Sequence, residues 1–243
     1  RLDFLVAGIY YGLKTGAGVL NMSLGGPYSR SLEEACRCAG QRAVLVGAAG
    51  NAGGEGITYP ARFPEVISVG AVDAEGFPAP YSNYGPELEL MAPGGTSREG
   101  VMSTSGSMKT GKYLPMWGTS MAAPHVAGAA ALLLACGAAR SPSDVRLSLQ
   151  EAASLYPGRT DGLGYGLLNV HRALFQRLEP CVFAGVEEDG VIRVKSEIAE
   201  TQLVAGRRRY RLDGLEPCSL NVYAWVDVNN NGRVDAGDFF AQS

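Results

Sequence analysis

A turn followed by a long apolar run limits the fold more than any other stretch of this sequence. Residues 118–128 read Gly-Thr-Ser-Met-Ala-Ala-Pro-His-Val-Ala-Gly, and alanine- and leucine-rich sequence follows as far as Cys136. This composition predicts a buried helix that begins near Ser120. Pro124 is compatible with such a helix, because a proline in the first turn removes an N–H group that has no intrahelical partner.

The position of Ser120 at the start of a helix favours negative charge on its side chain. The first N–H groups of a helix are unpaired, and the positive end of the helix dipole lies there. Such a position suits a hydroxyl whose oxygen must become an attacking nucleophile. Ser120 is therefore a candidate nucleophile, which requires a base within hydrogen-bond reach and a third group that orients the base.

Apolar strands alternate with helical patterns through the first two thirds of the chain. The predicted strands are Val19–Leu24, Ala43–Ala48, Val66–Val72 and Leu88–Met91. The predicted helices are an opening one from Leu2 to Leu13, Ser31–Gln41 with Ser31 as its cap, the segment after Ser120, a segment from Ser141 with Pro142 at its first position, and a last one ending near Arg177. This order predicts an α/β fold with a mostly parallel sheet and helices on both faces.

From Glu179 the pattern changes to short alternating strands separated by glycine and proline. These predicted strands are Val191–Ile198, Thr201–Leu212 and Leu220–Val226. The change predicts two domains, residues 1–177 with the α/β fold and residues 178–243 as a small all-β, sandwich-like domain.

Four segments of the first domain resemble one known family in the order that the family requires. Residues 118–128 resemble the nucleophile segment of the subtilisin-like serine proteases, the subtilases. Asn-Met-Ser-Leu-Gly-Gly at 21–26 and Gly-Ala-Ala-Gly-Asn at 47–51 match two further segments, and Tyr84 to Gly94 match a fourth. The resemblance covers Arg1 to about Arg177 and implies a secreted or cell-surface serine endopeptidase.

The resemblance implies roles for individual residues. Ser120 would be the nucleophile, and Asn51 would donate an N–H to the oxyanion together with the Ser120 backbone N–H. The two walls that flank the substrate would be Ser23, Leu24, Gly25 and Gly26 on one side and Ala48, Ala49 and Gly50 on the other. These residues carry no charge and allow a peptide to pair as an added strand, which implies polypeptide substrates and broad specificity.

Two points at these walls stay open from the residues alone. Asn51 could instead stabilise the glycine-rich turn at 50–54, as asparagine does in many turns. The segment that closes the pocket, near Gly56–Tyr59, is shorter than in many members of the family, so the sequence does not define the floor of the pocket.

Neither histidine of the chain fits the role of the base. His125 follows Ser120 by five positions on the same predicted helix and so points about 140° away from it. The resemblance implies that His125 packs behind the nucleophile, and we expect His171 to pack or cap locally. The family order is Asp, His, Ser, and no histidine precedes Ser120.

We therefore expect a missing N-terminal segment that carries the catalytic Asp and His, and we expect this chain alone to be inactive. The alternative is a catalytically inactive, protease-like protein that binds peptides or attaches to a surface. An Asp and a His-Gly-Thr-His-like segment in the upstream coding sequence would decide between the two.

Residues 227–238 have the spacing of a calcium-binding loop. Its oxygen ligands would be Asp227, Asn229, Asn231, the Arg233 carbonyl, Asp235 and Asp238. Since Val222–Val226 before the loop alternates like a strand, we predict a structural calcium site between strands and no helix-loop-helix unit. The alternative is an Asn-Gly turn with solvated acidic side chains. No organic cofactor is predicted.

Composition narrows the choice of partners. The net charge of −3 gives no reason to expect nucleic acid or an anionic membrane. The apolar run Ala127–Cys136 is shorter than the ~18 residues that suggest a membrane span. Of the five cysteines, Cys181 and Cys218 each follow Leu-Glu-Pro, and they could form a disulfide or be two small buried residues.

Overall fold

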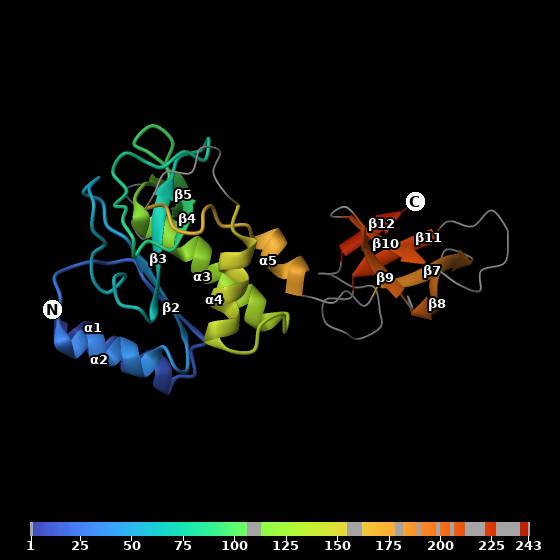
Figure 1. The fold of residues 1–243 in the computed structure, drawn as a ribbon, viewed down its shortest axis with the longest axis horizontal. Helices are drawn as coiled ribbons and strands as arrows, with labels where there is room; N and C mark the ends of the chain where they lie inside the picture. Colours follow the sequence, from blue (N-terminus) through green and yellow to red (C-terminus); the bar gives the residue numbers. More distant parts are fainter. Residues whose placement is uncertain are drawn as a thin grey trace. The chain divides into compact units, whose positions relative to one another are not determined.

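A computed structural model describes residues 2–105, 113–154 and 162–177, and, beyond these, six strands between residues 182 and 242 (Figure 1). Contacts within the chain divide it into two compact units, residues 1–177 and 178–243. Each unit is described by itself below.

The first unit is built on a parallel sheet with the order β1-β2-β3-β4. The strands are β1 (Val19–Met22), β2 (Val44–Ala48), β3 (Val66–Val72) and β4 (Leu90–Pro93). Every residue of β2 and β3 is buried, as expected for parallel strands that are covered on both faces. The prediction of an α/β fold with a mostly parallel sheet is confirmed, although β4 begins two residues later than predicted.

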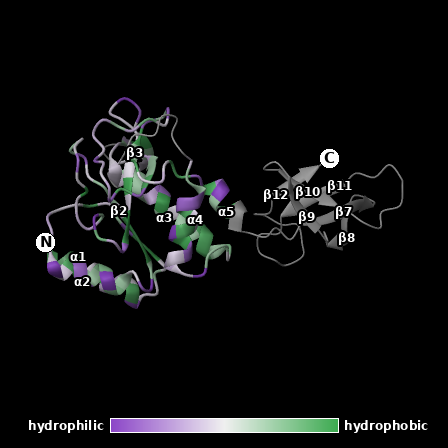
Figure 2. Cartoon of the chain, in the orientation of Figure 1, coloured by the Kyte–Doolittle hydropathy of each residue, from purple (hydrophilic) through white to green (hydrophobic). Residues whose placement is uncertain are grey.

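Five helices in the described residues of the first unit accompany this sheet. They are α1 (Leu2–Lys14), α2 (Arg30–Ala39), α3 (Thr119–Ala135), α4 (Pro142–Ala152) and α5 (Val170–Arg177). Within β2, Leu45 packs in the cluster formed by α1 and α2, whereas Val44 and Val46 pack in the cluster formed by α3 and α4. The side chains of one strand thus alternate between two cores, and helices cover both faces of the sheet. α1 and α2 carry hydrophobic and hydrophilic residues together, as helices with one exposed side do (Figure 2).

The start of α4 follows local capping chemistry, whereas the start of α2 differs from the predicted one. In α4 the Ser141 hydroxyl accepts a hydrogen bond from the Asp144 N–H at 3.1 Å, and Pro142 occupies the first turn. In α2 the prediction of Ser31 as the cap is wrong. Ser29 has the extended backbone of an N-cap residue, and the helix begins at Arg30.

Two elements of the first unit were not predicted. Strands β5 (Val101–Thr104) and β6 (Tyr113–Met116) form an antiparallel pair between β4 and α3. The side chains of this pair are largely exposed, although β6 and the following Trp117 are an apolar run, Tyr-Leu-Pro-Met-Trp.

In the second unit the described residues lie in antiparallel strands. They are β7 (Val182–Glu188), β8 (Val191–Glu197), β9 (Glu200–Val204), β10 (Arg207–Arg211), β11 (Val222–Val226) and β12 (Phe239–Gln242). They pair in the orders β12-β11-β7-β8 and β10-β9, so the predicted strand at Thr201–Leu212 is a pair of strands. The sandwich-like arrangement stays a prediction. The calcium loop at 227–238, Cys181 and Cys218 lie outside the described residues.

Candidate active site

Three sequence segments that were predicted to carry the site come together at the carboxyl ends of β1 and β2. Ser23 follows β1, and Ser120 lies in the first turn of α3. The Ser23 hydroxyl donates to the Ser120 carbonyl at 2.8 Å, and the Ser120 hydroxyl donates to the Ser23 carbonyl at 3.3 Å. These two bonds hold one predicted wall of the substrate site against the candidate nucleophile.

Asn51 reaches the same place from the end of β2. Both the backbone N–H and the hydroxyl of Thr119 donate to Asn51 Oδ1 at 2.9 Å. The Thr119 hydroxyl also accepts from the Gly50 N–H at 3.2 Å, which completes the link between the two segments. Because the N–H of Thr119 can only donate, the amide oxygen of Asn51 must face it, and the amide NH2 is the end left for another acceptor.

The candidate nucleophile and its predicted oxyanion donor are both accessible. Ser120 is half-buried and Asn51 is exposed. The Ser120 backbone N–H lies in the first turn of α3, where N–H groups have no intrahelical partner. The arrangement can therefore offer two N–H donors from different segments to an oxygen that develops negative charge beside Ser120.

The predicted walls differ in what they expose. Leu24, Gly25 and Gly26 are exposed, but the Gly26 backbone exchanges two hydrogen bonds with Tyr59, so an added strand would pair with Leu24 and Gly25. Ala48 and Ala49 are buried with their side chains in the core, and Gly50 is half-buried. The backbone groups of Ala49 and Gly50 are hydrogen-bonded within the chain, to Val69, Thr58, Asn83 and Thr119, and the alanine side chains do not face a substrate.

Neither of the two histidines is positioned to act as the base for Ser120. His125 Nδ1 lies 2.9 Å from the Met121 carbonyl, one turn back along α3. His125 is exposed, so the expectation that it packs behind the nucleophile is wrong. His171 lies in α5 and is also exposed. The hydrogen bond of the Ser120 hydroxyl goes to the Ser23 carbonyl and not to an imidazole.

Two residues that the sequence did not single out hold the site in place. Tyr81 accepts a hydrogen bond from the Gly118 N–H at 3.1 Å and donates to the Gly95 carbonyl at 2.7 Å. Burial raises the pKa of the Tyr81 hydroxyl, which keeps it protonated for this donation. The Asn83 amide accepts from the Ala52 N–H and donates to the Gly56 carbonyl, which secures the loop after Asn51. No local pattern marks either residue, since both act through contacts distant in sequence.

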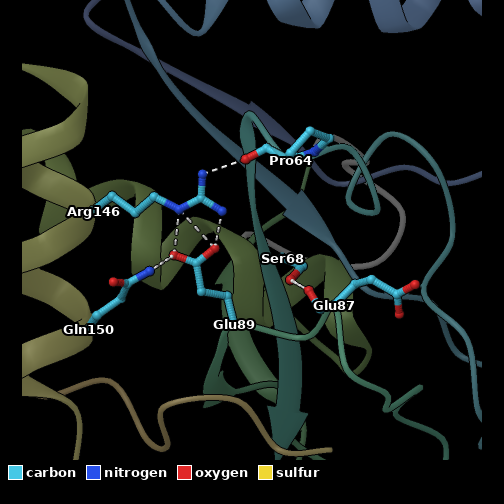
Figure 3. A network of polar contacts seen from close by, with 6 residues as sticks. All are labelled: Pro64, Ser68, Glu87, Glu89, Arg146 and Gln150. Atoms are coloured by element: carbon cyan, nitrogen blue, oxygen red, sulfur yellow. Dashed lines mark hydrogen bonds and ion pairs between the residues drawn. The ribbon is translucent and has the colours of Figure 1, made fainter.

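Two carboxylates near β4 are neutralised by arginines. Glu89 is buried and accepts hydrogen bonds from Arg146 Nε at 2.8 and 3.0 Å and from Gln150 Nε2 at 2.8 Å (Figure 3). Arg146 Nη2 binds the same carboxylate, and Glu87 pairs with Arg62 at 2.7 Å. Among the described residues no group of three or more His, Cys, Asp or Glu side chains could hold a metal ion. In the same part of the chain no helix has the length and apolar character of a membrane span.

Comparison with known proteins relates this chain to one family. The model of the subtilase family of peptidases matches residues 3–166. Subtilisin DY of Bacillus licheniformis is 42% identical over 175 residues, which cover 70% of this chain and 61% of that protein. The thermostable alkaline protease of Halalkalibacterium halodurans is 38% identical over 174 residues, which cover 71% of this chain and 46% of that protein.

Comparison with solved structures also relates this chain to proteases. The crystal structure of a lanthipeptide protease superposes with a TM-score of 0.63 at 26% identity and covers 71% of this chain and 65% of that one. A protease from Pseudoalteromonas arctica superposes with a TM-score of 0.62 at 34% identity. This match covers 67% of this chain and 52% of that one. This chain spans 45% to 62% of the length of the curated relatives given by these comparisons.

Proposed function

The chain belongs to the subtilase family, as its motifs predict, and from this premise we propose that it is the nucleophile-bearing part of a serine endopeptidase. In this proposal the Ser120 hydroxyl oxygen attacks the carbonyl carbon of a peptide bond in a polypeptide substrate. The carbonyl oxygen becomes negative and accepts hydrogen bonds from the Asn51 amide and from the Ser120 backbone N–H.

The single observation that carries the proposal is the double hydrogen bond from Thr119 to Asn51. It joins residues 68 positions apart, with both distances at 2.9 Å, and turns the NH2 end of the amide away from Thr119. A glycine-rich turn does not need this contact with the start of α3. It therefore favours the oxyanion role of Asn51 over the turn-stabilising role.

The proposed mechanism requires a base that accepts the Ser120 proton and a carboxylate that orients the base. His125 is bound to the Met121 carbonyl, and His171 lies on a different helix, α5. We propose that an imidazole and a carboxylate come from polypeptide outside these 243 residues, and that this chain alone does not hydrolyse peptides. Turnover by the chain alone that Ser120→Ala abolishes would overturn this part of the proposal.

Substrate binding in this proposal depends on the backbone. The exposed residues Leu24 and Gly25 pair with an extended peptide, and neither wall carries a charged side chain. Affinity then comes mainly from main-chain hydrogen bonds, which supports acceptance of both charged and uncharged sequences. We place the protein outside the cell or on its surface, a proposal supported by family membership and by the predicted calcium loop.

The test uses the protein encoded by the complete reading frame that contains this sequence. A serine-directed fluorophosphonate is expected to label Ser120, located by peptide mass spectrometry, and the Ser120→Ala variant is expected to take no label. Casein hydrolysis should be lost in the same variant. Well-folded protein that takes no label and hydrolyses no casein, yet binds peptides, would support the peptide-binding alternative.

A further inference from the structure

The chain between β3 and β4 is bonded to both segments that carry the proposed oxyanion donors. The Tyr81 carbonyl accepts a hydrogen bond from the N–H of Gly53, which lies shortly after Asn51, at 2.8 Å. The Tyr81 hydroxyl accepts from the N–H of Gly118, which lies shortly before Ser120, at 3.1 Å. One residue therefore binds the Asn51 loop through its backbone and the start of α3 through its side chain.

The loop after β4 fixes the tyrosine hydroxyl from its other side. The hydroxyl donates to the Gly95 carbonyl at 2.7 Å. The N–H groups of Gly94 and Gly95 both donate to the carbonyl of Val72, the last residue of β3, at 2.9 and 3.0 Å. A Cβ atom placed on Gly94 would lie 2.9 Å from the Tyr81 hydroxyl oxygen and 2.9 Å from the Gly118 carbonyl oxygen. The loop is thus closely packed against both groups, which leaves the hydroxyl little room to shift.

Gly118 is the point at which this restraint reaches the proposed oxyanion site. It is the N-cap of α3, it has no side chain to cap the helix, and a glycine backbone is freer to move than that of other residues. Its carbonyl accepts the first bond of the helix, from the Met121 N–H at 2.9 Å. A Cβ atom at this glycine would lie 3.4 Å from Asn51 Nδ2. A shift of Gly118 would therefore change the distance between the Asn51 amide and the Ser120 N–H.

We infer that Tyr81 is a positioning residue for the two proposed oxyanion donors. Its hydroxyl holds Gly118, and Gly118 sets the spacing between the Ser120 N–H and the Asn51 amide. The inference rests on the proposed function and extends it to a residue that acts through Gly118 and not on the scissile bond itself. Both donors act on charge that develops only in the transition state, so the effect belongs to the chemical step and not to substrate binding.

Tyr81→Phe is the test variant, because it keeps the aromatic ring and removes only the hydroxyl. The Gly118 N–H still donates to the Gly94 carbonyl, at 3.0 Å, so the restraint is loosened and not abolished. With a peptide p-nitroanilide and the protein encoded by the complete reading frame, kcat should fall roughly 10-fold and KM should stay within about twofold. The loss is smaller than for Asn51→Ala, since the donors are misplaced and not removed. Tyr10→Phe, in α1 and exposed, is the matched control and should leave both constants unchanged.

The double variant Tyr81→Phe/Asn51→Ala separates positioning from a general effect on the fold. If the hydroxyl acts by placing the Asn51 amide, its removal should matter little once that amide is gone, and kcat should lie within about threefold of Asn51→Ala alone. A kcat that falls by the product of the two single effects would overturn the inference. An unchanged kcat in Tyr81→Phe, together with a large loss in Asn51→Ala, would overturn the inference and leave the proposed function intact.

A second measurement does not depend on catalysis. Backbone hydrogen exchange is followed by mass spectrometry of peptic peptides that span residues 117–121, in the original protein, Tyr81→Phe and Tyr10→Phe. The amides of Gly118 and Thr119 should exchange at least about threefold faster in Tyr81→Phe and at the original rate in Tyr10→Phe. Faster exchange supports the restraint even if the protein has no turnover and the proposed function fails. Equal exchange in all three proteins contradicts the inference whether or not peptides are hydrolysed.

Discussion

At the residue scale, the Asn51 amide is held by its oxygen. Thr119 supplies two donors to that oxygen, so the nitrogen is the end that faces the proposed oxyanion. Gly118 lies beside the nitrogen, because a Cβ atom at this position would be 3.4 Å from Asn51 Nδ2. Its φ of 141° is also a backbone conformation that favours glycine. A side chain at residue 118 would strain the backbone and crowd the amide.

Replacement of Asn51 should reduce the rate of the chemical step more than substrate binding. Asn51→Ala removes the proposed oxyanion donor, so we expect kcat to fall by about 10²–10³ with little change in KM, a range known for an oxyanion-hole asparagine of a subtilisin. Steady-state kinetics of the protein encoded by the complete reading frame would measure this. A rise in KM at unchanged kcat would instead indicate a role in ground-state binding.

The cysteines of α2 should differ sharply in reactivity. Burial, with a smaller effect from Glu65, raises the pKa of the Cys36 thiol to about 12, whereas Cys38 is exposed. A raised pKa keeps the thiol protonated below that value, and the protonated thiol is not the nucleophile. Iodoacetamide at pH 8 should therefore modify Cys38 and spare Cys36 in the folded protein.

Peptide mapping of the alkylated protein checks this difference. Denaturation before alkylation is the control, because it should make both thiols reactive. Rapid modification of Cys36 in the native protein at pH 8 would contradict the buried environment of this residue.

At the scale of elements, α3 places the nucleophile because one face of this helix is buried from its first turn to Leu133. The buried alanines of this face and Val126 pack on β2, β3 and β4, and small side chains let the helix approach the sheet closely. Ser120 at its start is thereby brought to the carboxyl ends of the strands, where ligands bind in sheets of this type. The position of the hydroxyl is set by packing of the whole helix and not by the turn alone.

The helix α4 is tied to the chain before β4 by an ion pair. Arg146 and Gln150 project from α4 and surround the Glu89 carboxylate, and Arg146 also donates to the Pro64 carbonyl (Figure 3). Glu89 has 6% of its side chain exposed, whereas Arg146 has 33%. Removal of the arginine would leave a buried carboxylate with one neutral donor.

Arg146→Met should destabilise the first unit substantially. Breaking a buried pair costs about 3–5 kcal/mol, and we expect the lower end because Arg146 is partly in water. The double variant Arg146→Met/Glu89→Met should recover much of the loss, since it leaves no unpaired charge. Urea unfolding followed by circular dichroism measures both. Equal destabilisation in the single and double variants would show that packing, and not charge pairing, dominates.

At the scale of the whole molecule, the two units differ in how they are built. The first has a sheet covered by helices on both faces, and the described part of the second contains antiparallel strands. The candidate active site uses residues of the first unit alone. We therefore assign the predicted calcium loop a stabilising role in the second unit and no step in catalysis.

Calcium should raise the melting temperature of the second unit by mass action. At a free calcium concentration 100 times its Kd, binding stabilises the folded unit by about 2.7 kcal/mol. For a small domain this corresponds to a rise in melting temperature of roughly 10 °C or more. The chain has two tryptophans, so Trp117→Phe leaves Trp225 in β11 as the fluorescent reporter of this unit.

Melting of this variant is compared in excess calcium and in chelator. Asp227→Ala/Asp238→Ala is the control, and it should melt at the same temperature in both conditions. If the Trp117→Phe protein has the same melting temperature with and without calcium, residues 227–238 are better described as an Asn-Gly turn with solvated acidic side chains than as a calcium site.

Local patterns in the sequence were sufficient for most of the elements and for the motifs of the site. Apolar runs marked β2 and β3 because buried parallel strands leave no polar face, and Ser141-Pro142 marked the start of α4 because capping is a local interaction. The family followed from residues 118–128 and three matching segments. The β5–β6 pair was not predicted: β5 is only four residues long and half polar, and Pro115 interrupts the apolar run of β6.

Only the tertiary structure decided which side chains meet. The Thr119–Asn51 bonds, the bond from Gly118 to the Tyr81 hydroxyl and the pairing of Arg146 with Glu89 join positions that are distant in sequence. Periodicity and capping determine where a strand or helix begins and which side it buries. The distances between side chains on different elements depend on how those elements pack, and packing is a property of the folded chain as a whole.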